Sequence, residues 1–86
     1  MERDTSPPRV LVLVRAGCHL CVDAVEIVTR VCAEVGSSWS TRDVDDDPAL
    51  RAQFTDHVPV TFVDGRQLSL WFVDEAGLRA ALTSSS

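Results

Sequence analysis

Val10-Leu11-Val12-Leu13-Val14-Arg15-Ala16-Gly17-Cys18-His19-Leu20-Cys21 is the stretch that decides the fold of this chain. Its apolar run lies between two arginines, from Arg9 to Arg15, as in a strand that is buried on both faces of a sheet. From Cys18 to Val35 the apolar residues recur at threes and fours, which predicts a helix that Gly36 ends. Two thiols therefore lie where a strand is followed by a helix.

The length and composition of the chain are those of one small globular domain. It has 86 residues, of which 45% are hydrophobic and 24% are charged. These fractions are ordinary for a folded protein, and the length leaves no room for a second core. We expect a folded domain over residues 9–82, a flexible N-terminal segment over residues 1–8 and a flexible tail over residues 83–86.

The charge and the apolar runs of the chain indicate which partners and which location to expect. The net charge is −5, and the eight cationic residues are all arginines. Nucleic acid is an improbable partner, because a surface that binds phosphate groups needs an excess of positive charge and this chain has a net negative charge. No apolar run approaches the roughly 20 residues that span a bilayer, and Met1-Glu2-Arg3-Asp4 lacks the pattern expected of a signal peptide. We expect a cytoplasmic monomer that does not bind membranes.

The remaining segments complete a mixed α/β pattern. Residues 39–44 alternate in a way that predicts a polar edge strand. Asp47 is expected to cap a short helix from Pro48 to about Thr55. Asp64-Gly65 predicts a two-residue turn between strands over residues 60–63 and 66–72.

Asp74 is expected to cap a last helix, which gives the order β-α-β-α-β-β-α. A right-handed crossover pairs the first two strands in parallel, and the hairpin then joins the same sheet in the antiparallel sense. The sequence therefore predicts a mixed four-stranded sheet with three helices on its faces.

The spacing of Cys18 and Cys21 suits reversible redox chemistry. With Cys18 at the helix cap and Cys21 one turn later, their Cβ atoms lie roughly 5–6 Å apart, close enough to form a disulfide. Closing so small a ring stabilises a fold little, so chemistry is the better reason for the pair. The helix N-terminus lowers the pKa of a thiol, which makes Cys18 the expected nucleophile and Cys21 the resolving thiol.

Other residues near the dithiol leave alternatives open. His19 is either a solvated first-turn residue or a side chain that tunes the thiol and contacts the substrate. The Cys-x-x-Cys pair is also half of a zinc site, although Cys32 lies about 16 Å further along the same helix and only His57 is left to approach. We expect no metal, and we expect Cys32 to be a buried core residue.

The chain resembles the short glutaredoxin-like proteins of the thioredoxin fold, from about Arg9 to Leu82. The resemblance rests on Cys18-His19-Leu20-Cys21, on Val58-Pro59 before a strand, and on Val63-Asp64-Gly65. It implies that the Val58–Pro59 peptide bond is cis, and that Val58 and Pro59 bind the substrate beside the dithiol.

The chain also departs from the glutaredoxin pattern at two places. Typical glutaredoxins have Pro-Tyr between the cysteines, where this chain has His19-Leu20. They also have a Gly-Gly-x-Asp segment that holds glutathione, where this chain has Trp71-Phe72-Val73-Asp74. We expect the aromatic pair to serve packing, no tightly bound cofactor, and an external reductant that is glutathione, another low-molecular-weight thiol or a protein.

The leading hypothesis is a thiol–disulfide oxidoreductase that acts on disulfide-containing proteins or on small thiol compounds. In this hypothesis Cys18 attacks the substrate disulfide and Cys21 resolves the adduct. The alternative is a non-catalytic module of the same fold that binds a metal or a partner through its cysteine face. A third, weaker hypothesis is an acidic protein-interaction domain.

Overall fold

The computed structural model describes residues 8–54 and 57–84. Its elements, in chain order, are β1 (Val10–Val14), α1 (His19–Val35), β2 (Trp39–Asp43), a 3-10 turn η1 (Val44–Asp46), α2 (Pro48–Phe54), β3 (Val60–Val63), β4 (Arg66–Leu70) and α3 (Glu75–Ser84). The order β-α-β-α-β-β-α predicted from the sequence is confirmed.

The strands form one four-stranded sheet in the order β2-β1-β3-β4. β1 pairs with β2 in parallel, with Val10 opposite Trp39, and with β3 in the antiparallel sense, with Leu13 opposite Val60. β4 pairs antiparallel with β3. The apolar strand β1 is therefore interior and the polar strand β2 is an edge, as the sequence predicted, because an edge strand keeps one side in contact with water.

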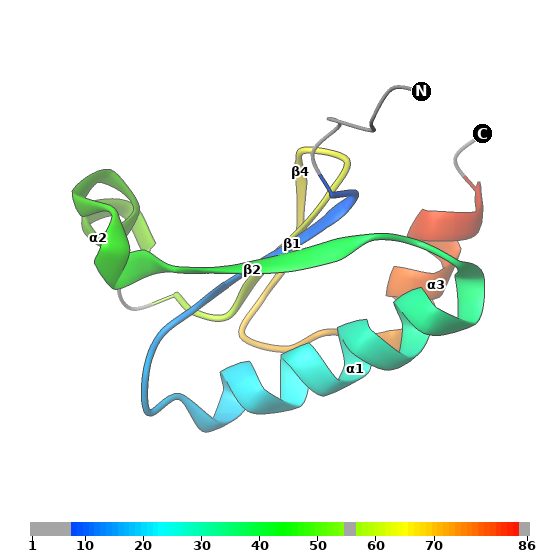
Figure 1. Cartoon of the computed structure of the whole chain (residues 1–86), viewed down its shortest axis with the longest axis horizontal. Helices are drawn as coiled ribbons and strands as arrows, with labels where there is room; N and C mark the ends of the chain where they lie inside the picture. Colours follow the sequence, from blue (N-terminus) through cyan, green and yellow to red (C-terminus); the bar gives the residue numbers. More distant parts are fainter. Residues whose placement is uncertain (1–7, 55–56, 85–86) are drawn as a thin grey trace, which may run out of the picture.

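The helices lie on both faces of the sheet. Figure 1 shows α1 and α3 together on one side, where they cover a core that includes Val12, Val28 and Leu78. On the other face a smaller cluster around Leu13 packs against Phe54 of α2. The alternation of side chains along β1 supplies both cores, because successive residues of a strand point to opposite faces.

Aspartate side chains begin the short helices where the sequence predicted them. Asp47 Oδ1 accepts a hydrogen bond from Ala49 N at 2.9 Å, and Asp74 Oδ2 accepts one from Gly77 N at 3.2 Å. These bonds satisfy backbone donors that a helix N-terminus leaves free. Among the described residues no helix has the length and apolarity needed to cross a membrane.

Some predicted element ends differ from the structure. β4 stops at Leu70 instead of reaching Phe72, because Trp71 takes a left-handed backbone conformation with φ of 65° that turns the chain out of the sheet. The strand predicted over residues 39–44 ends at Asp43, whose carboxylate accepts a hydrogen bond from Asp45 N at 2.8 Å and starts η1.

The structure describes only part of the two terminal segments that were predicted to flank the domain. α3 continues through Ser84, so it includes the first half of the segment expected to be a tail. Residues 1–7, the expected helix end at Thr55, and the last two residues lie outside the described residues.

Candidate functional site

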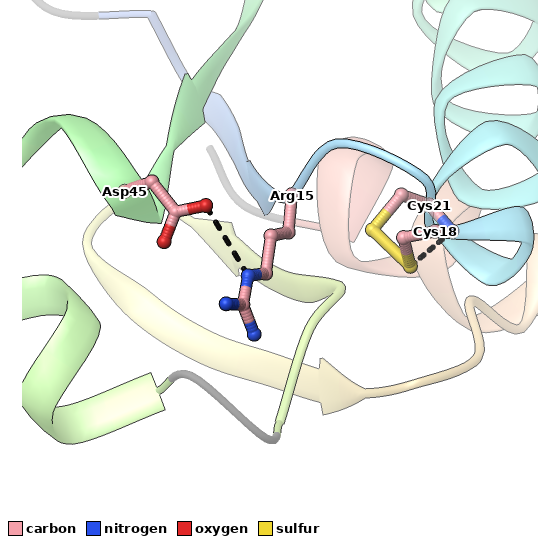
Figure 2. Close-up of a disulfide and its surroundings, with 4 residues drawn as sticks. All are labelled: Arg15, Cys18, Cys21 and Asp45. Carbon is pink, nitrogen blue, oxygen red and sulfur yellow. Dashed lines mark hydrogen bonds and ion pairs between the residues drawn. A yellow bond between two sulfur atoms is a disulfide. The ribbon is translucent and has the colours of Figure 1, made fainter.

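The two cysteines lie at the start of α1, as the sequence predicted. Cys18 is the N-cap residue with an extended backbone, and its Sγ accepts a hydrogen bond from Cys21 N at 3.1 Å. The Cα atoms of the two residues are 5.2 Å apart and their sulfurs are joined in a disulfide. Figure 2 shows this disulfide in the first turn of the helix, next to the loop that leaves β1. A sulfur in this position faces the free N–H groups of the helix, which favour its thiolate form.

The two sulfurs differ in their access to solvent. Cys18 is half-buried, whereas Cys21 is only 4% exposed and belongs to the buried residues of α1. A molecule in solvent therefore reaches Cys18 more readily than Cys21, which lies one helical turn further along α1. This asymmetry suits one attacking thiol and one internal thiol that later displaces an adduct.

Arg15 lies in the loop before the dithiol and contacts an acidic partner. Its Nε donates to Asp45 Oδ2 at 3.2 Å, and Figure 2 shows the side chain directed away from the disulfide toward Asp45. The guanidinium and the carboxylate are each about one-third or more exposed, so this is a surface ion pair. The neighbouring carboxylate offsets much of the field that Arg15 would otherwise exert on Cys18.

Pro59 lies at the same end of the sheet as the dithiol. The antiparallel register places Val60 opposite Leu13, so the residue before β3 stands beside the carboxyl end of β1, from which the chain leads to Cys18. The Val58–Pro59 peptide bond is cis, as the resemblance implied. Pro59 is fully buried, and Val58 packs partly into the smaller apolar cluster.

A cavity of about 610 Å³ opens beside the disulfide, between α1 and β2. Its lining is mostly apolar with two charged residues, and consists of Val14, Arg15, Gly17, Cys18, His19, Cys21, Val22, Val25, Glu26, Trp39 and Thr41. His19 is exposed and lines this cavity next to Cys18, the nucleophile predicted from the sequence. A second apolar cavity lies on the opposite face of the sheet, around Leu11 and Phe62, and the sheet separates it from the dithiol.

The aromatic pair Trp71-Phe72 does not serve packing as the sequence indicated. Trp71 is 44% exposed and Phe72 is 68% exposed. The Trp71 ring stacks on the His57 ring with centroids 6.0 Å apart, and Trp71 N donates to Pro59 O at 2.7 Å. Trp71 therefore contacts both the His57 ring and the backbone of Pro59.

The third cysteine is distant from the site and buried. Cys32 is 1% exposed in the core near the end of α1, as predicted. Burial raises the pKa of its thiol, and the neighbouring Ser37 and Arg9 oppose that rise only in part. A buried thiol with a raised pKa is a weak nucleophile, so Cys32 is poorly suited to attack a disulfide.

Comparison with known proteins places this geometry in a family. The family described as "Glutaredoxin-like domain (DUF836)" matches residues 9–83, which include the dithiol, Pro59, α1, α2 and α3 except its last residue. The chain belongs to this glutaredoxin-like family. A relative of the glutaredoxin-like domain is the uncharacterized protein Rv0508 of Mycobacterium tuberculosis, which is 43% identical over 86 residues, covering 94% of this chain and 89% of that protein.

Solved structures agree with this assignment. The X-ray structure of XcR50 from X. campestris is similar with a TM-score of 0.72 and 33% identity, covering 90% of this chain and 99% of that one. The thioredoxin of Fasciola hepatica is similar with a TM-score of 0.60 and 21% identity, covering 90% of this chain and 79% of that one. The second likeness shows the thioredoxin fold of the glutaredoxin-like domain and nothing of its substrates.

The sequence did not reveal the β2 side of the site. Trp39 and Thr41 follow Cys21 by about twenty positions and carry no motif. They line the same cavity as the dithiol of the glutaredoxin-like domain because β2 pairs with β1 beside the face of the sheet that α1 covers.

Proposed function

We propose that this glutaredoxin-like domain is a thiol–disulfide oxidoreductase in which Cys18 is the nucleophile and Cys21 is the resolving thiol. One observation carries the proposal. Cys18 caps α1 and accepts the Cys21 N–H bond in a half-buried position, while Cys21 is shielded directly behind it. The first thiol is therefore activated and accessible, and the second is reserved for an intramolecular step.

The proposed cycle balances in atoms and electrons. The Cys18 thiolate attacks one sulfur of a substrate disulfide, forms a mixed disulfide, and releases the other substrate sulfur as a thiolate that takes a proton from water. Cys21 loses its proton to solvent and attacks Cys18 Sγ, which forms the Cys18–Cys21 disulfide and releases the second substrate thiol. The substrate gains two electrons and two protons, and the dithiol loses them.

An external thiol restores the dithiol in this proposal. Two molecules of glutathione or of another low-molecular-weight thiol, or one dithiol protein, supply the electrons, and no tightly bound cofactor is needed. We place His19, Val58 and Pro59 around the bound substrate, with the protein acting as a monomer in the reducing cytoplasm.

The experiment that tests the proposal compares cysteine variants on a small neutral disulfide, bis(2-hydroxyethyl) disulfide, with a thiol reductant. Cys18→Ser is expected to abolish the reaction. Cys21→Ser is expected to retain the first step and to accumulate a mixed disulfide on Cys18 that intact-mass measurement detects. Cys32→Ser serves as the matched control, because the third thiol is buried and distant. Equal rates in all four proteins would eliminate the proposed function.

A further inference from the structure

The cycle described above uses Cys18, Cys21 and His19 and gives no role to the rest of the lining of the cavity between α1 and β2. Val22 and Val25 form its α1 wall, each one helical turn beyond a cysteine, and Trp39 forms its β2 wall. The sheet order places this cavity on the β2 side of β1, whereas Pro59 lies on the β3 side. The cavity and Pro59 are thus on opposite sides of β1, although Cys18 itself forms part of the cavity wall.

Exposed apolar side chains gather at the dithiol end of the molecule. Of the four large apolar side chains that are exposed among the described residues, Val22 is 57% exposed and lines the cavity beside Cys18. Trp71 and Phe72 border a hollow with Leu20, the residue before Cys21. Exposed apolar surface on both sides of a reactive thiol is suited to a polypeptide partner, because a small charged thiol has little apolar surface to cover it.

We propose that the substrates are proteins in which a bulky apolar side chain adjoins the reacting disulfide, and that this side chain binds in the cavity between α1 and β2. This inference rests on the proposed function. The cavity volume of about 610 Å³ exceeds the volume of one leucine or phenylalanine side chain, so it admits that side chain with a short stretch of backbone. The covalent bond fixes the register, since the substrate sulfur must reach Cys18 Sγ in the same wall.

The chemical step follows from this placement. The Cys18 thiolate attacks the substrate sulfur that carries the apolar neighbour, and this sulfur becomes joined to Cys18 while its former partner leaves as a thiolate. The apolar side chain is then held by Val22, Val25 and Trp39 until Cys21 displaces the product. Binding of the side chain before attack raises the rate of the first step, because the reacting sulfurs are already oriented.

The test uses two short peptides that differ in one side chain. Each is neutral and contains one cysteine, preceded by leucine in one peptide and by serine in the other, and each is joined through a disulfide to 2-thiopyridine. Attack on the cysteine sulfur releases 2-thiopyridone, which absorbance in a stopped-flow instrument records. We expect the reduced wild-type protein to react about tenfold faster with the leucine peptide, the discrimination typical of an apolar pocket.

Variants of the cavity rim locate the preference. Val22→Ser removes an exposed apolar wall, and Thr41→Glu places a charge at the mouth of the cavity, and neither touches the buried core. Each is expected to reduce the leucine preference to about threefold or less. Leu68→Ser and Gln67→Glu are the matched controls, because they make the same changes at exposed positions of β4 outside this cavity, and they should keep the tenfold preference.

The outcomes separate the inference from the function on which it rests. Equal rates with both peptides, in a protein that still releases 2-thiopyridone rapidly, would overturn the inference and leave the oxidoreductase standing. A preference that survives both rim variants would place the binding of the side chain elsewhere and would also overturn it. A reaction with the mixed disulfide of 2-mercaptoethanol and 2-thiopyridine, which has the same leaving group, as fast as with the leucine peptide would exclude proteins as the favoured substrates. No reaction with any disulfide would refute the proposed function itself.

Discussion

Alanine variants of two glycines at opposite ends of α1 allow the effect of dithiol position on activity to be measured apart from the effect of lost stability. Gly17 precedes the cap residue Cys18 and has φ of 77°, and Gly36 ends the helix with φ of 75°. A Cβ atom built on either glycine meets no heavy atom within 4 Å. Replacing either one by alanine therefore adds backbone strain without a steric clash.

The size of that strain can be worked out from the shared conformation. Alanine in the left-handed region costs about 1–2 kcal/mol, and the lower entropy of its unfolded chain returns about 0.4–1 kcal/mol. Each variant should thus lose about 1 kcal/mol of unfolding free energy. For a domain of this size that loss lowers Tm by about 4–8 °C, and a total stability of about 5–15 kcal/mol leaves both variants folded.

The two variants should differ in the rate of disulfide exchange although they lose the same unfolding free energy. A shift of the backbone at Gly17 moves Cys18 relative to the N–H of Cys21, and small displacements of a nucleophile cost up to about a hundredfold in rate. We expect Gly17→Ala to slow disulfide exchange about tenfold, and Gly36→Ala to leave it unchanged. Urea unfolding gives the stabilities, and the stopped-flow assay gives the rates.

The reasoning has two points at which it can fail. If Gly36→Ala slows exchange as much as Gly17→Ala, the loss of rate reflects general destabilisation and not the position of Cys18. If Gly17→Ala is as stable and as fast as the wild type, the loop before the dithiol does not depend on the left-handed conformation.

Three further predictions follow from the packing and the charges. Hydrogen bonds from Arg30 and Arg79 lower the pKa of Glu75, so its contribution to stability is present above the ordinary carboxyl pKa and is lost as the pH falls through the lowered value. Glu75→Gln should therefore lower Tm at neutral pH and leave it unchanged in strong acid. Burial raises the pKa of Cys32, so iodoacetamide should modify Cys18 in the reduced native protein and should reach Cys32 only after denaturation, as peptide mass mapping will show. Leu78→Ala should lower the urea-derived unfolding free energy by about 2–5 kcal/mol because this α3 side chain is fully buried in the core shared with α1 and β1.

The elements that the sequence predicted correctly depend on local patterns. The apolar run of β1, the three-and-four spacing in α1 and the Asp47 and Asp74 caps each involve residues that are close in the chain. Such patterns predict the structure correctly because they depend on interactions within one strand, one helix or one turn. The position of Cys18 at the start of α1 belongs to this class.

The element ends and surface contacts that the sequence missed depend on neighbours from distant segments. Trp71 leaves the sheet and turns its ring toward His57, where the sequence indicated a longer strand and a packed aromatic pair. Arg15 pairs with Asp45 from beyond the neighbouring strand β2, so its charge is partly offset. Neither contact has a periodic or capping signal, because each arises only after the sheet has formed.

The sequence by itself determined that two thiols stand at the beginning of a helix, since the apolar run, the cysteine spacing and the helical periodicity are properties of one continuous segment. The tertiary structure alone decided what lies around those thiols. β1 separates the Pro59 side from the β2 side, and parallel pairing carries Trp39 and Thr41 to the wall of a cavity beside Cys18. Linear order does not encode that neighbourhood, because side chains far apart in the chain meet only when the strands pair and the helix packs across them.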